Sequence, residues 1–171
     1  MPRSSLKIIA NGICVSKIRY GLAAYGTPRT ESTQPEDQSM KNLQVRLNTI
    51  LRTILGKKKL DKIPVMDLHK MCNIPTVNQM TLEAILLETW KTMQILRNSD
   101  LHKMMTQNSY GSNMTTRNQG KKLLRPGAPM KSFAYHGVKL WNSVPMLKFC
   151  DKKCEAKSVI RKNVDKLVAV L

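Results

Sequence analysis

The strongest constraint on the fold is a set of amphipathic segments of helix length, and residues 35–56 give the clearest of them. The apolar side chains of this segment recur at i, i+3 and i+4, a spacing that places them on one face of a helix. Pro35 and Asp37 favour a helix start, because proline fits the first turn and an acidic side chain interacts favourably with the helix dipole. Gly56 fits the left-handed position that follows a last turn. We therefore expect a helix here, with a buried stripe of Leu43, Leu47, Ile50, Leu51 and Ile54.

The N-terminal segment, residues 5–25, shows the same periodicity, and the sequence predicts a helix that ends around Gly21 or Gly26. Its expected buried face comprises Leu6, Ile9, Ile13, Ile18 and Leu22.

Helical patterns also follow the clearest segment. A short helix is expected from Pro64, then a tight break, then a long helix to about Arg97. Thr76 and Gln79 have capping-box spacing at the start of the long helix. A last helix is expected over residues 155–168. Because no segment shows a convincing strand pattern, we predict an all-α fold.

Residues 131–145, KSFAYHGVKLWNSVP, predict a short helix with a sharp stop. Ser132 suits its N-cap, and Pro145 disfavours helical geometry at the residue before it. Trp141 lies on the apolar face of this helix. An aromatic side chain at helical spacing is more often a core residue than a base-stacking one, so we expect Trp141 to anchor a small core.

Composition divides the chain into three parts. Residues 106–130 are rich in Asn, Thr, Ser, Gly and Lys and contain two prolines, as is typical of a long loop. We expect a thumb-like helical domain over residues 1–100, a basic linker over 101–131, and a C-terminal helical segment over 132–171.

The charge favours a polyanionic partner. The 171 residues include 29 Lys and Arg against 11 Asp and Glu, a formal net charge of +18. Such an excess of positive charge is normally offset by a polyanionic partner, and nucleic acid is the leading candidate. A mobile basic loop can contact the phosphates of a nucleic-acid backbone. A solvated helix end is the alternative explanation for the lysines that follow Gly56. The candidate contacts are Lys57, Lys58, Lys59 and Lys62 in one cluster and Arg117, Lys121, Lys122 and Arg125 in the linker.

The sequence offers no catalytic constellation. No two aspartates are adjacent, Leu51 stands where a phosphate-binding loop needs its first glycine, and no Gly-x-Ser-x-Gly elbow occurs. His69, Cys72, Cys150 and Cys154 could supply four zinc ligands, but these two pairs lie too far apart in sequence for a compact zinc module. We therefore expect no metal, no cofactor and no enzymatic activity of the chain on its own.

A helix-turn-helix is a further interpretation of the break before Thr76. A recognition helix should present basic and amide groups, whereas the long helix carries Glu83 and Glu88 before its first lysine, Lys91. We therefore do not adopt this interpretation.

The cysteines and the N-terminus favour an intracellular location, in the cytoplasm or nucleus. Four scattered cysteines do not resemble a secreted disulfide framework, and no segment is a convincing signal peptide or membrane span. A mitochondrial presequence is the alternative, because five basic residues precede the first acidic one, Glu31.

Four blocks together resemble the C-terminal part of the reverse transcriptase of Jockey-type, non-LTR retrotransposons. SKIRYGLAAYG (16–26) is similar to the helix after the palm, and LQVRLNTILRTILG (43–56) to the next helix of the thumb. IPVMDLHKMCNIPTVNQM (63–80) is similar to the family's short helix, break and long helix. SFAYHGVKLWNSVP (132–145) resembles its terminal block, in which an aromatic-led helix ends in Trp-Asn-Ser, an aliphatic residue and Pro.

This resemblance implies a transposable-element protein that grips the backbone of a template–primer, RNA or an RNA–DNA or DNA duplex, through basic residues. The catalytic palm with its paired aspartates is expected upstream of Met1, so the chain would be an RNA-directed DNA polymerase fragment without polymerase chemistry. The alternatives are a helical protein-interaction or vestigial domain and an imported mitochondrial RNA-binding protein.

Overall fold

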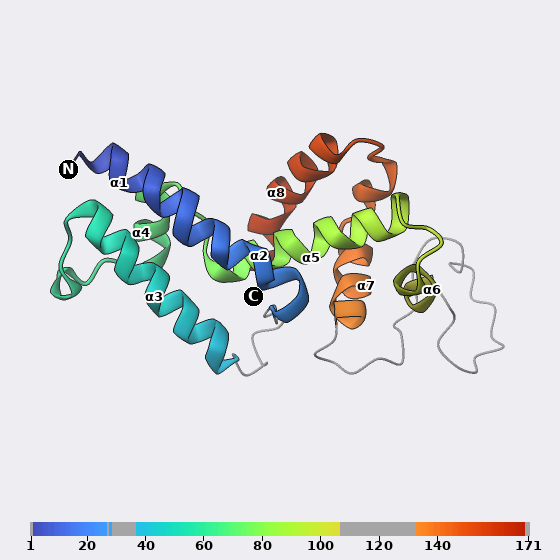
Figure 1. The fold of residues 1–171 in the computed structure, drawn as a ribbon, viewed down its shortest axis with the longest axis horizontal. Coiled ribbons are helices and arrows are strands. Elements are labelled where there is room, and N and C mark those ends of the chain that lie inside the picture. The colour runs from blue at the N-terminus through green and yellow to red at the C-terminus, as the bar shows by residue number, and fades with distance from the viewer. Residues whose placement is uncertain (1, 27, 29–36, 107–132, 170–171) are drawn as a thin grey trace. The chain divides into compact units, whose positions relative to one another are not determined.

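The computed structural model describes residues 2–26, 28, 37–106 and 133–169, and all regular structure within these residues is helical (Figure 1). The predicted all-α class is therefore confirmed. The elements are α1 (Arg3–Ile9), η1 (Ala10–Val15), α2 (Ser16–Tyr25), α3 (Gln38–Leu55), η2 (Lys59–Asp61), α4 (Val65–Cys72), α5 (Val77–Gln94), α6 (Asp100–Thr106), α7 (Phe133–Ser143), η3 (Pro145–Phe149) and α8 (Lys153–Ala169).

The helices form two compact units, which we call the N-terminal unit (Met1–Thr81) and the C-terminal unit (Leu82–Val170). They divide within α5, whereas the sequence-based division has its boundaries after residues 100 and 131. That division into domains stays a prediction.

Helix α3 ends directly before Gly56, as its sequence predicts, and begins at Gln38, later than the first turn expected at residues 35–37. The carboxylate of Asp37 accepts a hydrogen bond from the Ser39 N–H at 2.8 Å, which satisfies one free amide of the first turn. Gly56 follows the last turn with φ 65°, a left-handed conformation that glycine adopts without a steric penalty. Within the expected stripe, Leu47, Leu51 and Ile54 are buried, and the remaining two side chains are half-buried. The helix therefore presents its predicted face to the core of the N-terminal unit.

The expected buried face of the N-terminal helix is wrong at two positions. Ile9 and Ile13 are 44% and 55% exposed, whereas Leu22 is buried as expected and Ala10 and Val15 are buried in addition. Ile13 lies within η1, a π-helical segment between α1 and α2. The wider turns of a π-helix move the side chains within it away from the positions that an uninterrupted 3.6-residue period assigns to them.

The start of α5 confirms the capping box. The Thr76 N–H donates to Gln79 Oε1 at 2.7 Å, and the Gln79 N–H donates to Thr76 Oγ1 at 3.2 Å. These two bonds satisfy donors that a helix start otherwise leaves free. The helix ends at Gln94 and not near Arg97.

Two tryptophans anchor the core of the C-terminal unit. Trp90 of α5 is 1% exposed, and its indole N–H donates to the Cys150 carbonyl at 2.9 Å. Trp141 of α7 is 3% exposed and belongs to the same apolar cluster, so the prediction that it anchors a core is confirmed. The cluster draws on α5, α7, η3 and α8, and it includes Leu86, Leu147 and Ile160.

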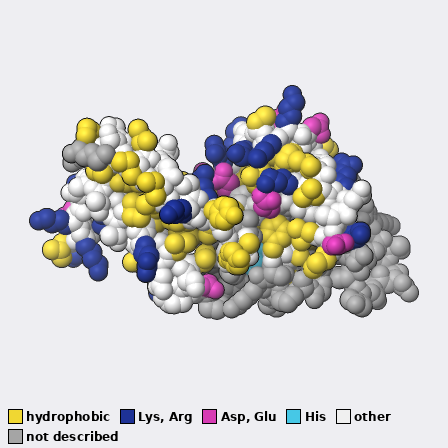
Figure 2. Space-filling model, viewed as in Figure 1, with side chains coloured by type: hydrophobic (Ala, Val, Ile, Leu, Met, Phe, Trp, Pro, Cys, Tyr) yellow, Lys and Arg dark blue, Asp and Glu magenta, His cyan; other side chains and the backbone are white. Residues whose placement is uncertain are grey.

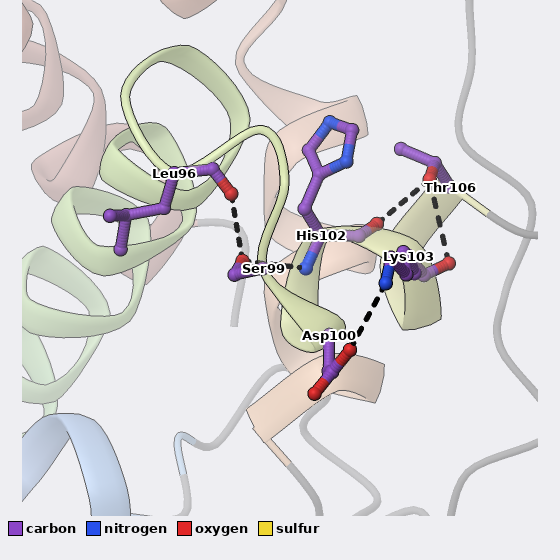
Figure 3. A network of polar contacts seen from close by, with 6 residues as sticks. All are labelled: Leu96, Ser99, Asp100, His102, Lys103 and Thr106. Atoms are coloured by element: carbon purple, nitrogen blue, oxygen red, sulfur yellow. Dashed lines mark hydrogen bonds and ion pairs between the residues drawn. The ribbon is translucent and has the colours of Figure 1, made fainter.

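Helix α6 is absent from the sequence-based prediction. Ser99 caps it: its hydroxyl accepts from the His102 N–H at 3.2 Å and donates to the Leu96 carbonyl at 2.7 Å (Figure 3). Asp100 lies in the first turn and pairs with Lys103 at 3.3 Å. Gly137 of the following helix, α7, lies close to α6: a Cβ at this position would come within 2.7 Å of Met105 Cε.

Candidate nucleic-acid interface

The first predicted lysine cluster forms a loop between α3 and α4, residues 57–62, which we call the basic loop. Its start is fixed by the end of α3. The Gly56 N–H donates to the Thr53 carbonyl at 3.2 Å, and the Lys57 N–H donates to the Arg52 carbonyl at 2.9 Å. The lysines therefore follow directly on a helix C-terminus, where positive charge is favourable.

A tight turn shapes the middle of the basic loop. The Lys58 N–H donates to the Asp61 carboxylate at 2.8 Å, and the Asp61 N–H donates back to the Lys58 carbonyl at 3.2 Å. Lys62 then has φ 44°, a left-handed conformation that is unfavourable for a residue with a Cβ. The single acidic side chain of the loop thus holds its backbone.

The lysine side chains of the basic loop are available for a ligand. Lys57, Lys58, Lys59 and Lys62 are all exposed, and none pairs with an acidic side chain in the part of the chain that the structure describes. Figure 2 shows Lys and Arg side chains gathered where Figure 1 places the segment between α3 and α4. With Asp61 included, the loop carries a net charge of 4 − 1 = +3. The structure therefore brings the first predicted cluster together.

Arg52 is a further basic residue at this site that the sequence-based candidates omit. It lies in the last turn of α3, one hydrogen bond from the basic loop, and its side chain is half-buried. Its Nε is buried without a hydrogen-bond partner in the described structure. The signal that identifies it is its position: a cation in a last turn, directly before a lysine run.

The second predicted cluster, Arg117, Lys121, Lys122 and Arg125, lies outside the described residues. Its part in a nucleic-acid contact stays a prediction.

A buried polar network fixes the two helices that flank the basic loop. The His69 ring of α4 contacts the Ile74 carbonyl through Nδ1 at 2.8 Å and Gln44 Nε2 of α3 through Nε2 at 2.8 Å. Gln44 Oε1 accepts from the Val77 N–H at 2.8 Å, which orients the amide so that its nitrogen faces the ring. Because a carbonyl oxygen can only accept, Nδ1 carries a proton and donates to Ile74, while Nε2 lies 2.8 Å from Gln44 Nε2 and 3.0 Å from Asn48 Oδ1. Desolvation by burial lowers the pKa of His69, against the opposing effect of backbone acceptors.

Among the described residues, no three or more His, Cys, Asp and Glu side chains form a group that could hold a metal ion. Both nitrogens of His69 are engaged within the protein. Burial raises the pKa of the thiols of Cys72 and Cys150, which opposes their use as thiolates. The network of Figure 3 caps a helix and does not direct polar groups to a common point.

No protein-family model, curated protein or solved structure matches the chain. Among the described helices, none is long and apolar enough to cross a bilayer.

Proposed function

We propose that the chain binds double-stranded nucleic acid through phosphate contacts of the basic loop, without carrying out polymerase chemistry itself. The observation that supports this most directly is the group of four exposed lysines on a turn that a fifth residue, Asp61, holds in place. A net charge of +18 adds a long-range attraction to the same partner.

The residue types favour backbone contact over base recognition. Lysine acts as a compact point charge, whereas base-edge recognition generally relies on the planar fork of arginine or on amides. The basic loop contains four lysines and no arginine, asparagine or glutamine. We therefore expect binding with little sequence preference and a strong dependence on salt.

The four sequence blocks support a more specific origin for this grip. On their resemblance, the chain corresponds to the C-terminal region of a Jockey-type, non-LTR retrotransposon reverse transcriptase. The basic loop follows the block that resembles a thumb helix. A thumb holds the template–primer by its backbone, so an RNA–DNA duplex is the natural probe.

The test is the affinity for a 20-base-pair RNA–DNA duplex as a function of salt. Replacing Lys57, Lys58, Lys59 and Lys62 together by Gln should flatten the log–log slope by up to about 3.6, since each neutralised phosphate contributes about 0.9. The control replaces four exposed lysines at and near the start and on the outer face of α8 by Gln: Lys152, Lys153, Lys162 and Lys166. An unchanged slope for the basic-loop variant would remove the basis of the proposal.

A protein-interaction domain is the second candidate, and one observation favours it. Large apolar side chains are exposed on the N-terminal helices, with Ile8 at 72%, Tyr20 at 94% and Tyr25 at 84%. Contiguous exposed apolar surface often marks a protein contact. Failure to bind duplex near micromolar concentration at low salt would favour this candidate over the first.

A further inference from the structure

An apolar side chain stands in the middle of the basic loop. Leu60 is 85% exposed and lies between Lys59 and Asp61 in the short helix η2. Single exposed leucines are common on protein surfaces and need no explanation. Leu60 is distinguished by its setting, because the other five side chains of the six-residue basic loop are all charged.

The loop conformation keeps Leu60 out of the core. The reciprocal bonds between Lys58 and Asp61 close the turn around it, so its position does not depend on its own side chain. The next apolar residue, Ile63, follows the loop and is half-buried. Lys62 completes the turn in a strained left-handed conformation. Strain of this kind persists where the surrounding structure imposes it, and it is frequent in binding loops.

We propose that Leu60 inserts as an apolar wedge into the minor groove of bound duplex, while the lysines on both sides of it contact the flanking phosphates. Proteins that bind the minor groove often combine cationic side chains on the backbone with an apolar side chain against the base steps. The wide, shallow minor groove of an A-form-like duplex admits such a short loop. This inference rests on the proposed function and specifies how the same loop engages its ligand.

The first experiment separates the wedge from the phosphate contacts. Leu60→Ala and Leu60→Gln should weaken binding of the RNA–DNA duplex about threefold to tenfold, as expected when a partly buried leucine side chain is truncated or made polar. The salt slope should remain that of the wild type, because the charge of the loop does not change. Both variants should fold normally, since Leu60 is exposed.

The second experiment reports on the environment of the side chain. In Leu60→Trp, acrylamide should quench the added tryptophan strongly in the free protein and weakly in the presence of duplex. The matched control is Tyr20→Trp at another highly exposed position of the same unit, where quenching should not change. The native tryptophans should contribute little to the change in quenching, because both are buried and shielded from acrylamide.

The outcomes distinguish the two proposals. If the wild type binds duplex with a slope that depends on the basic loop, but the Leu60 variants bind equally well and Leu60→Trp stays accessible, the wedge is wrong and the grip stands. If the wild type does not bind duplex at low salt, the proposed function fails as well. Protection of Leu60→Trp by phosphatidylserine vesicles, and not by duplex, would overturn the wedge in favour of an anionic membrane.

Discussion

At the scale of single residues, two buried histidines differ in whether their ring nitrogens have hydrogen-bond partners. His69 is 4% exposed and has partners for both ring nitrogens. His136 of α7 is 3% exposed, and neither ring nitrogen has a hydrogen-bond partner within the described structure; its ring meets Tyr135 edge-on at 5.5 Å. Burial lowers the pKa of both, and the charge of Lys139 lowers that of His136 further. Each folded unit therefore favours a neutral histidine.

The pH dependence of stability follows from these lowered pKa values. Below the unfolded value of 6.5, the unfolded chain takes up protons that the folded state resists, so stability is full above pH 6.5 and falls as the pH drops toward the folded pKa. Between about pH 7.5 and 5.5 the decrease is at most about 1.4 kcal/mol per histidine. Urea unfolding of wild type and His136→Leu, followed by tryptophan fluorescence, measures it. His136→Leu should be destabilised less by acidification, and equal decreases would contradict a protonation penalty at His136.

Gly137 marks a close contact between helices of the C-terminal unit. A Cβ at this position would come within 2.7 Å of Thr89 Oγ1, and that hydroxyl is held by the Ile85 carbonyl at 2.8 Å. We expect Gly137→Ala to destabilise the unit by about 1–3 kcal/mol through overpacking. The matched control is Gly12→Ala, where nothing lies within 4 Å and where alanine should be neutral or stabilising. Urea unfolding followed by circular dichroism compares the two variants, and a stabilising Gly137→Ala would show that the contact relaxes.

At the scale of elements, local signals predicted those helices whose ends and faces depend on short-range chemistry. The stripe and Gly56 of α3 are such a case, because the period is uninterrupted and the glycine has an intrinsic conformational advantage. The prediction that Ile13 of the N-terminal helix is buried was wrong because a π-helical turn changes the period. No residue type in the sequence indicates such a turn. Helix α6 was missed because seven residues give too little periodicity, although Ser99 followed by Asp100 is a usable start signal.

In the candidate site too, the features with local signals could be predicted from the sequence, and those that depend on the tertiary structure could not. The lysines are visible in the sequence, but the turn that Asp61 closes and the half-buried position of Arg52 depend on where α3 stops in three dimensions. Likewise, the Gln44–His69 contact joins residues 25 positions apart and has no local signature.

The capping box of α5 gives an element-scale prediction. Thr76→Ala removes the hydroxyl that accepts from the Gln79 N–H, and should cost about 0.5–2 kcal/mol of stability in the N-terminal unit. Thr76→Ser retains the hydroxyl and should cost clearly less. Both tryptophans lie in the C-terminal unit, so the measurement is urea unfolding by circular dichroism. Equal destabilisation of the two variants would assign the effect to the buried methyl group.

At the scale of the whole molecule, charge is the property that links the two predicted clusters. The excess is larger in residues 101–171, with 14 − 3 = +11, than in residues 1–100, with 15 − 8 = +7. The basic loop belongs to the first hundred residues, and Arg117, Lys121, Lys122 and Arg125 belong to the remainder. If both clusters contact one duplex, their contributions to counterion release should add.

The last prediction tests this sum. Replacing Arg117, Lys121, Lys122 and Arg125 by Gln should flatten the salt slope by about 0.9 for each phosphate that is no longer neutralised. In a variant that also carries the four basic-loop substitutions, the slope should flatten further, by the same amount that the basic-loop substitutions cause on their own. The measurement is duplex affinity between about 50 and 200 mM salt, the range over which several phosphate contacts change affinity by orders of magnitude. The α8 lysine variant again serves as the control for a general reduction of charge. An unchanged slope for the four linker substitutions would confine the grip to the basic loop, and a combined effect no larger than either alone would mean that the two clusters do not hold the same duplex together.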